Sequence, residues 1–252
     1  MNRIKISPLA TDTLCEANPS ANSPAQNALE RKFGAATTAD EFSLFVPMHY
    51  EKNYAYPLIV WLHSNEQNAA QIQKVMLDMS MRNYVGIAPQ SAIGSSQAGY
   101  FWNQDLETIE MAHDSVLAAI DRASMRCNIA SHRVFLAGSG AGGTMAFRLA
   151  FERPEIFAGV MSINGPLPAE QAPLRDWSRC RELPVFWAHG RGTEDFEQEQ
   201  LCQQLTLLHV AGFSVTLRQY PRPDLLCQKT MSDMNHWLME MISSAIVDPH
   251  RD

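Results

Sequence analysis

The chain has 252 residues, a formal net charge of −7, 46% hydrophobic residues and 19% charged residues. This is an ordinary globular composition, and the length suits one α/β domain with a sizeable buried core. The acidic balance provides no electrostatic attraction to nucleic acid or to an anionic membrane surface, so we expect neither as a partner.

The cysteines favour a reducing environment. There are five, an odd number, and no two have the C-x-x-C spacing of a metal or redox site. We therefore expect free thiols, no metal and no cofactor. Arg3 and Lys5 are followed by no apolar stretch, so a signal peptide is not expected. The longest apolar run is too short to span a membrane, and a cytoplasmic protein is predicted.

The first predicted unit is a loosely ordered extension over residues 1–38. It is rich in Ala, Ser, Asn, Thr and Pro, a composition that buries little apolar surface, and one short helix is expected near Leu29. The folded domain is expected to occupy residues 39–252. It opens with a weakly alternating segment from Phe42 to Val46 that ends at Pro47, which is typical of an edge strand.

Short uninterrupted apolar runs follow along the domain. Each is bounded by Gly, Pro or Asn, as expected for strands that are covered on both faces. Segments with apolar residues at helical spacing lie between them, and Thr230 and Asp233 have the capping-box spacing that predicts a helix start. The apolar runs are residues 58–62, 85–88, 134–137, 160–163 and 185–188, and the helical patterns include Ile72, Ile109, Leu201 and Met234.

This alternation predicts an α/β fold with a mostly parallel sheet and helices on both faces, in three α/β/α layers. In such a sheet, ligands bind at the carboxyl ends of the strands. We therefore expect the functional residues in the loops that follow Leu62, Pro89, Ala137, Ala188 and Tyr220.

The loop after residue 137 carries the most specific signal. Gly138 and Gly142 flank a tight turn between a strand and a helix, as in the G-x-S-x-G nucleophile elbow. With its continuation to Gly165, the segment resembles bacterial carboxylesterase/phospholipase-like (acyl-protein-thioesterase-like) α/β-hydrolases. The resemblance covers about residues 40–247. It implies a serine nucleophile midway between the two glycines, and that position is occupied by Gly140.

A second register stays open at this turn. If Ser139 were the nucleophile, Ala137 and Ala141 would be its small flanking residues. That register shifts both sides of the turn by one residue, whereas Gly142 and Gly143 fit the family pattern only in the first register. In the first register, Ser139 is an inert residue of the turn.

The other two triad positions also lack their usual residues. The resemblance implies an aspartate where Thr193 stands, with Glu194 and Asp195 directly behind as alternative carboxylates. It implies a histidine where Asp224 stands. An aspartate has an unperturbed pKa of about 3.9, against about 6.5 for histidine, so it is a poor acceptor for a serine proton at neutral pH.

Further candidate residues surround the elbow. The resemblance implies an oxyanion loop that begins at His63 and Ser64, and a second oxyanion group at Ala141, directly after the nucleophile position. His63 is expected to line a pocket. An aromatic run precedes a helix on the same side, and at least one of its rings is expected to form an apolar wall. The run consists of Tyr100, Phe101 and Trp102.

We therefore expect a hydrolase homologue that is catalytically inactive and keeps a ligand- or partner-binding role. Its expected partners are a small acyl or aromatic ligand and a second copy of the chain. The alternative is an active serine hydrolase that cleaves small carboxylic esters or thioesters through Ser139 and a non-standard base. A third hypothesis is altered chemistry built on His63, Asp195 or Asp224.

Overall fold

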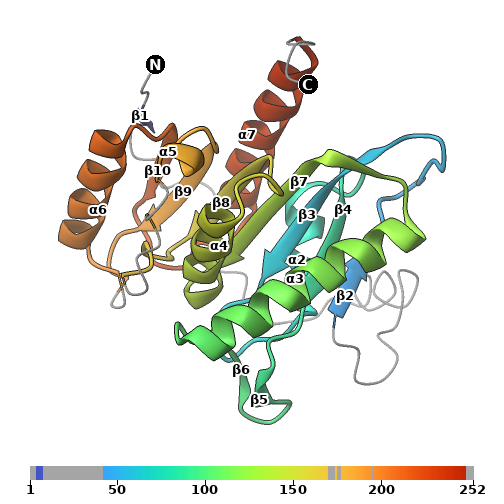
Figure 1. The fold of residues 1–252 in the computed structure, drawn as a ribbon, viewed down its shortest axis with the longest axis horizontal. Helices are drawn as coiled ribbons and strands as arrows, with labels where there is room; N and C mark the ends of the chain where they lie inside the picture. Colours follow the sequence, from blue (N-terminus) through green and yellow to red (C-terminus); the bar gives the residue numbers. More distant parts are fainter. Residues whose placement is uncertain (1–3, 8–41, 170–173, 175–176, 194–195, 248–252) are drawn as a thin grey trace.

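The computed structural model describes residues 4–7, 42–169, 174, 177–193 and 196–247 (Figure 1). An eight-stranded sheet forms its centre, with the order β1-β10-β9-β8-β7-β3-β4-β2. Among the described strands of this sheet, every pairing is parallel except that of β2 with β4. The predicted mostly parallel sheet is confirmed. Its strands are β1 (Ile4–Ser7), β2 (Phe42–Phe45), β3 (Tyr56–Leu62), β4 (Val85–Pro89), β7 (Ile129–Ser139), β8 (Gly159–Ile163), β9 (Val185–Gly190) and β10 (Val215–Tyr220).

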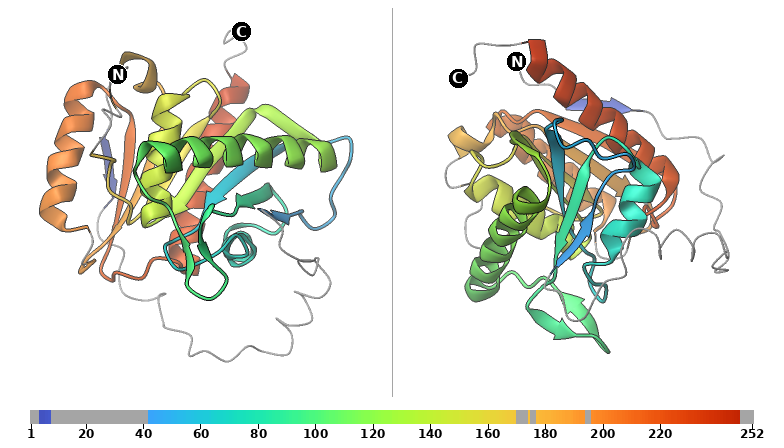
Figure 2. Two further views of the ribbon diagram at one scale, coloured as in Figure 1. Left: turned by 60° about the horizontal axis from the view of Figure 1, so that its bottom comes forward. Right: turned by 90° about the vertical axis from the view of Figure 1, so that its right-hand side faces the viewer.

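Helices cover both faces of the sheet. Residues of α3, α4 and α6 share one hydrophobic cluster with the strands, and residues of α2 and α7 share another. The right-hand view of Figure 2 shows the two groups of helices on opposite sides of the sheet. The predicted layers are thereby confirmed. The helices are α2 (Gln71–Met79), α3 (Leu106–Arg126), α4 (Ala141–Glu152), α5 (Trp177–Cys180), α6 (Gln198–Ala211) and α7 (Gln228–Val247).

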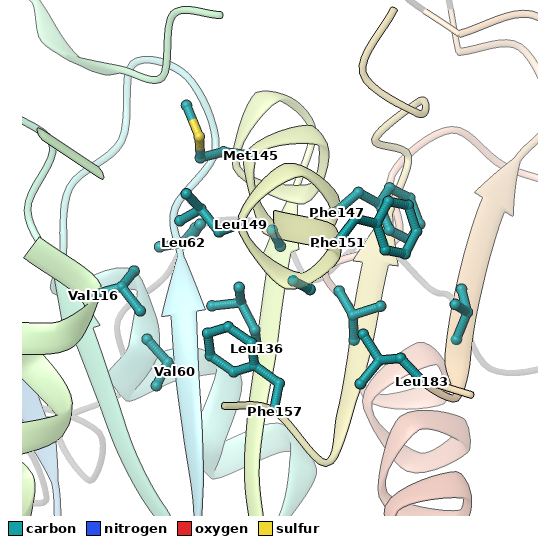
Figure 3. Packing of buried hydrophobic residues seen from close by; sticks show 14 of the residues in the cluster. Val60, Leu62, Val116, Leu136, Met145, Phe147, Leu149, Phe151, Phe157 and Leu183 are labelled. Atoms are coloured by element: carbon teal, nitrogen blue, oxygen red, sulfur yellow. The ribbon is translucent and has the colours of Figure 1, made fainter. Parts of the chain in front are cut away.

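Burial on both faces explains the continuous apolar runs. Along β3, Leu58, Val60 and Leu62 pack into the cluster of α3 and α4, whereas Ile59 and Trp61 pack into the cluster of α2 and α7. All five side chains are 0% exposed. Figure 3 shows the first cluster, where side chains of α4 and of the strands beneath it meet. A strand covered in this way is apolar at every position, so the alternation typical of half-buried strands is lost.

The prediction for the N-terminal extension needs a correction. Ile4–Ser7 forms β1, which pairs in parallel with β10 and places Ile4 opposite Val215. These four residues therefore belong to the sheet, and the expected boundary at residue 38 does not hold for them. A strand this short carries no periodic signal of its own, and its partner lies near the other end of the chain. The rest of the extension, with the helix expected near Leu29, lies outside the described residues.

Two smaller features also differ from the prediction. Helix α7 begins at Gln228, so Thr230 is not its cap, and Asp233 instead accepts a hydrogen bond from the Tyr220 hydroxyl (2.9 Å). An antiparallel hairpin, which the sequence did not indicate, joins β5 (Ile93–Ser95) to β6 (Gly99–Phe101). None of the described helices combines the length and apolarity that crossing a membrane requires.

Candidate functional site

The elbow forms at the junction of β7 and α4. β7 ends at Ser139, α4 begins at Ala141, and Gly140 between them has φ 55° and ψ −126°. The Gly140 N–H donates to the Ile163 carbonyl oxygen (2.8 Å), and the Gly140 carbonyl accepts from the Thr144 N–H (3.1 Å). A positive φ suits glycine because it has no Cβ. Gly140 therefore occupies a sharp strand-to-helix turn.

The flanking glycines indicate the register of this turn. A Cβ built at Gly138 would overlap the backbone of Gly142, and a Cβ built at Gly142 would overlap the carbonyl oxygens of Leu62 and His63. Both positions therefore require glycine, as do the outer glycines of a G-x-S-x-G elbow. The geometry supports the register in which Gly140 lies midway between them.

The position of Ser139 differs from that of a nucleophile. It is the last residue of β7, pairs with Ile163 in the sheet, and is 7% exposed. In the described part of the chain, no hydrogen bond joins its hydroxyl to a histidine. A serine becomes a nucleophile when an adjacent base accepts its proton, and the described residues provide none.

The space in front of the elbow is open. Apart from its own chain neighbours, no heavy atom of the described residues lies within 4 Å of the Cβ position of Gly140. Gly140 and Ala141 are both partly exposed. The site therefore has room for the side chain that a nucleophile would need, but glycine supplies no such side chain.

The predicted acid position, Thr193, lies in residues 190–193, here called the acid-position loop, at the end of β9. Thr193 is half-buried, and its hydroxyl donates to the Gly190 carbonyl oxygen (2.5 Å). The hydroxyl thereby closes its own turn, and it carries no charge that could stabilise an imidazolium. Glu194 and Asp195, the alternative carboxylates, lie outside the described residues.

The predicted base position, Asp224, lies in residues 221–226, here called the base-position loop, after β10. Asp224 is exposed, and its Oδ1 accepts a hydrogen bond from the Leu226 N–H (3.2 Å). This local side-chain-to-backbone bond is a common way for aspartate to stabilise a turn. The carboxylate therefore serves its own loop and faces solvent.

His63 lies in the interior, so its expected place in a pocket wall is wrong. The ring is 0% exposed. Its Nδ1 lies 2.9 Å from the Ser64 carbonyl oxygen, and its Nε2 lies 3.3 Å from the Ser91 N and 3.2 Å from Gln90 Nε2. Nδ1 therefore carries the proton and Nε2 accepts. Burial lowers the pKa of His63 and outweighs the Ser64 carbonyl, which raises it. The Ser64 N–H, a candidate oxyanion donor, already donates to the Gln71 side-chain oxygen (3.2 Å).

His189 is also a buried, structural histidine. It lies on β9 and is 1% exposed. Its Nε2 lies 2.9 Å from the Phe196 carbonyl oxygen, and burial lowers its pKa. Across the described residues, no group of three His, Cys, Asp or Glu side chains is arranged to hold a metal ion.

The aromatic run divides between the interior and the surface. Trp102 is buried, and its Nε1 donates to the His63 carbonyl oxygen (3.0 Å), so it fastens two loops and does not form a wall. Tyr100 and Phe101 are half-buried on β6. These two rings therefore stay available as the apolar surface beside the site.

Asn164 has a role that sequence reasoning missed. It follows β8 with φ 53°, its Oδ1 accepts from the Gly190 N–H (2.8 Å), and its Nδ2 donates to the Pro223 carbonyl oxygen (2.7 Å). It thus joins the end of β8 to both the acid-position and the base-position loop. The sequence signal was an Asn-Gly pair after a strand, which indicates a turn but not its partners.

The part of the chain that carries this site matches a known protein family. Residues 59–242, which include the elbow and both loops, match the profile of the phospholipase/carboxylesterase family. The chain belongs to this family. The sheet order and the helical layers show the carboxylesterase-like α/β-hydrolase fold of this family.

Individual relatives agree with the family. NocK of Nocardia uniformis subsp. tsuyamanensis, provisionally described as an esterase, is 27% identical over 136 residues, which make up 52% of this chain and 39% of NocK. The chain thus spans about two fifths of that relative (39%). The Bacillus cereus carboxylesterase structure has a TM-score of 0.64 at 14% identity and covers 79% of this chain and 93% of its own. A phospholipase/carboxylesterase from Dyadobacter fermentans has a TM-score of 0.58 at 17% identity, with 80% and 97% covered. At these identities the structures show the fold alone.

Proposed function

We propose that this member of the phospholipase/carboxylesterase family does not hydrolyse esters and instead binds a small acyl or aromatic ligand, or a protein partner, at the carboxyl ends of its strands. The observation that carries the proposal is Gly140. Its turn keeps the backbone of a nucleophile elbow and open space in front, yet contains no reactive atom. Glycine offers neither a nucleophile nor a proton for a base to remove.

The other two positions support the same function. The Thr193 hydroxyl and the Asp224 carboxylate both form hydrogen bonds within their own loops. Triad members act as a unit, so a protein without the nucleophile gains little from the remaining acid and base. Replacement at all three positions is therefore the pattern that a binding role would leave.

An active hydrolase that uses Ser139 is the alternative, and the likeness to NocK favours it. This alternative lacks a suitable base. Both ring nitrogens of His63 have partners, and His189 is buried on its strand. The third hypothesis, altered chemistry on His63, Asp195 or Asp224, has less support, because His63 is fully buried and the Asp224 carboxylate accepts a hydrogen bond within its own loop.

Activity can be tested directly. We expect no turnover of short-chain p-nitrophenyl esters above the solvent rate, and no labelling by a serine-directed fluorophosphonate probe. Ser139→Ala is the matched control, because any activity that depends on Ser139 disappears in it. Stoichiometric labelling of Ser139, located by peptide mass spectrometry, would overturn the proposal.

Binding requires its own measurement. We expect short-chain acyl or aromatic carboxylates to raise the melting temperature, and Tyr100→Ala to weaken this effect. Tyr54→Ala is the control, because Tyr54 is an exposed ring at the amino end of β3, the opposite edge of the sheet. Equal ligand responses in both variants would place binding elsewhere.

A further inference from the structure

A single turn contacts all three segments that carry the triad positions. The turn is residues 163–165, directly after β8. The Ile163 carbonyl accepts the Gly140 N–H (2.8 Å), and a Cβ built at Gly165 would lie 2.6 Å from the Gly140 carbonyl oxygen, so the elbow packs directly on this turn. Asn164 supplies the contacts to the other two loops.

The two loops also lie directly against each other. β9 and β10 stay paired up to Gly190 and Tyr220, and a Cβ built at Gly190 would overlap the Arg222 carbonyl oxygen. The chain of the base-position loop therefore crosses over Gly190. Its hydrogen bond from Asn164 Nδ2 to the Pro223 carbonyl is made at this crossing, next to the bond from the Gly190 N–H to Asn164 Oδ1. One amide group thus uses its acceptor for one loop and its donor for the other.

The backbone of Asn164 also indicates a specific role. Its φ of 53° lies in the left-handed region, which few residues other than glycine adopt and in which asparagine is enriched. A glycine at residue 164 would allow the same turn but would make neither side-chain bond. The backbone geometry alone therefore does not require an amide here; the two loops do.

We propose that Asn164 is the positioning residue of the site and fixes the acid-position and base-position loops relative to each other and to the elbow. This role goes beyond the proposed binding function, because it holds whether the site binds a ligand or turns one over. It also assigns the two arms of the side chain: Oδ1 holds residues 190–193, and Nδ2 holds residues 221–226.

Hydrogen–deuterium exchange of the full chain tests this assignment, read on peptides that cover residues 185–193 and 219–227. Asn164→Asp keeps the acceptor for Gly190 but loses the donor for Pro223, so exchange should rise only in the second peptide. Asn164→Gly suits the backbone and loses both bonds, so exchange should rise in both peptides. Loss of one such bond corresponds to roughly a five- to tenfold faster exchange.

The control is Asn235→Gly on α7, which removes the acceptor of the Tyr84 hydroxyl (2.8 Å); among the described residues, no hydrogen bond joins the Asn235 side chain to either loop. It should destabilise the protein without selective loosening of either peptide. The proposal is overturned if both Asn164 variants exchange like the wild type. It is also overturned if they raise exchange evenly over all peptides, as the control does, or if Asn164→Asp loosens residues 185–193 as much as Asn164→Gly.

Discussion

The ends of β3 and β7 are neighbours in the sheet, but they differ in how their side chains are used. At the end of β3, His63 is fully buried, has partners at both ring nitrogens, and accepts the Trp102 indole N–H at its carbonyl. At the end of β7, Gly140 faces open space. The surroundings of the site are therefore packed and bonded as a rigid frame, whereas the position that would react is empty.

This difference bears on the proposed binding role. A protein that bound nothing at this place would have no need for the sharp elbow turn or for an amide that ties two loops together. Such features are kept when their geometry has a use. A rigid frame around an open centre is therefore the arrangement that the proposed binding role predicts.

Gly142→Ala should have the largest effect on stability, because its new methyl group would collide with the backbone at the end of β3. Its Cβ would overlap the Leu62 and His63 carbonyl oxygens, which are backbone atoms at the end of β3. Overpacking costs typically about 1–3 kcal/mol and occasionally more, and we expect the upper end here because the colliding atoms belong to the backbone. We expect unfolding at markedly lower urea concentration, or failure to fold. A Gly142→Ala protein as stable as the wild type would mean that the two strand ends are not in close contact.

Gly140→Ala should have a smaller effect with a different cause. Apart from the chain neighbours, no described atom lies within 4 Å of its Cβ position, so only the positive φ of 55° penalises the methyl group. We expect a loss of about 1–2 kcal/mol in the free energy of unfolding. Comparison with Gly142→Ala in urea separates backbone strain from collision. An unchanged or raised stability would mean that residue 140 adopts a negative φ in solution.

The pH dependence of stability tests the region around His63. Burial lowers the pKa of His63 in the folded protein below its unfolded value of about 6.5. Below that pH the unfolded state takes up the proton first, so stability is full above pH 6.5 and falls as the pH decreases, by at most about 1.4 kcal/mol per pH unit. Burial also lowers the pKa of His189, so its contribution to stability falls with decreasing pH in the same way. We expect lower urea midpoints at pH 5.5 than at pH 7.5.

His63→Gln keeps an acceptor for the Ser91 N–H and removes one of the two buried titrating groups, so it should reduce this dependence; the part due to His189 should remain. The control is His236→Gln, which removes a surface histidine, 72% exposed, and leaves the hydrogen bonds around His63 intact. If the slope of His63→Gln equals that of the wild type, the loss at low pH arises from other groups.

The sequence was most informative where interactions are local. Continuous apolar runs located the central strands, and the Gly138–Gly142 spacing located the elbow, because strand burial and tight turns act on adjacent residues. β1 was missed because its stability comes from pairing with β10, which is remote in the chain. The burial of His63 and the two bonds of Asn164 were missed for the same reason: their partners lie on other loops, brought together only by the order of strands in the sheet.

The smallest expected effect is that of Gly140→Ser on esterase activity, which should be none. The open space at residue 140 accepts a side chain, so the serine can be placed, but its hydroxyl has no base. The triple change Gly140→Ser, Thr193→Asp and Asp224→His restores nucleophile, acid and base on loops that Asn164 holds together. It is therefore the variant in which hydrolysis of p-nitrophenyl acetate should appear. Activity in the single variant would mean that a base already faces the elbow, and the centre of the site would then be less empty than Gly140 indicates.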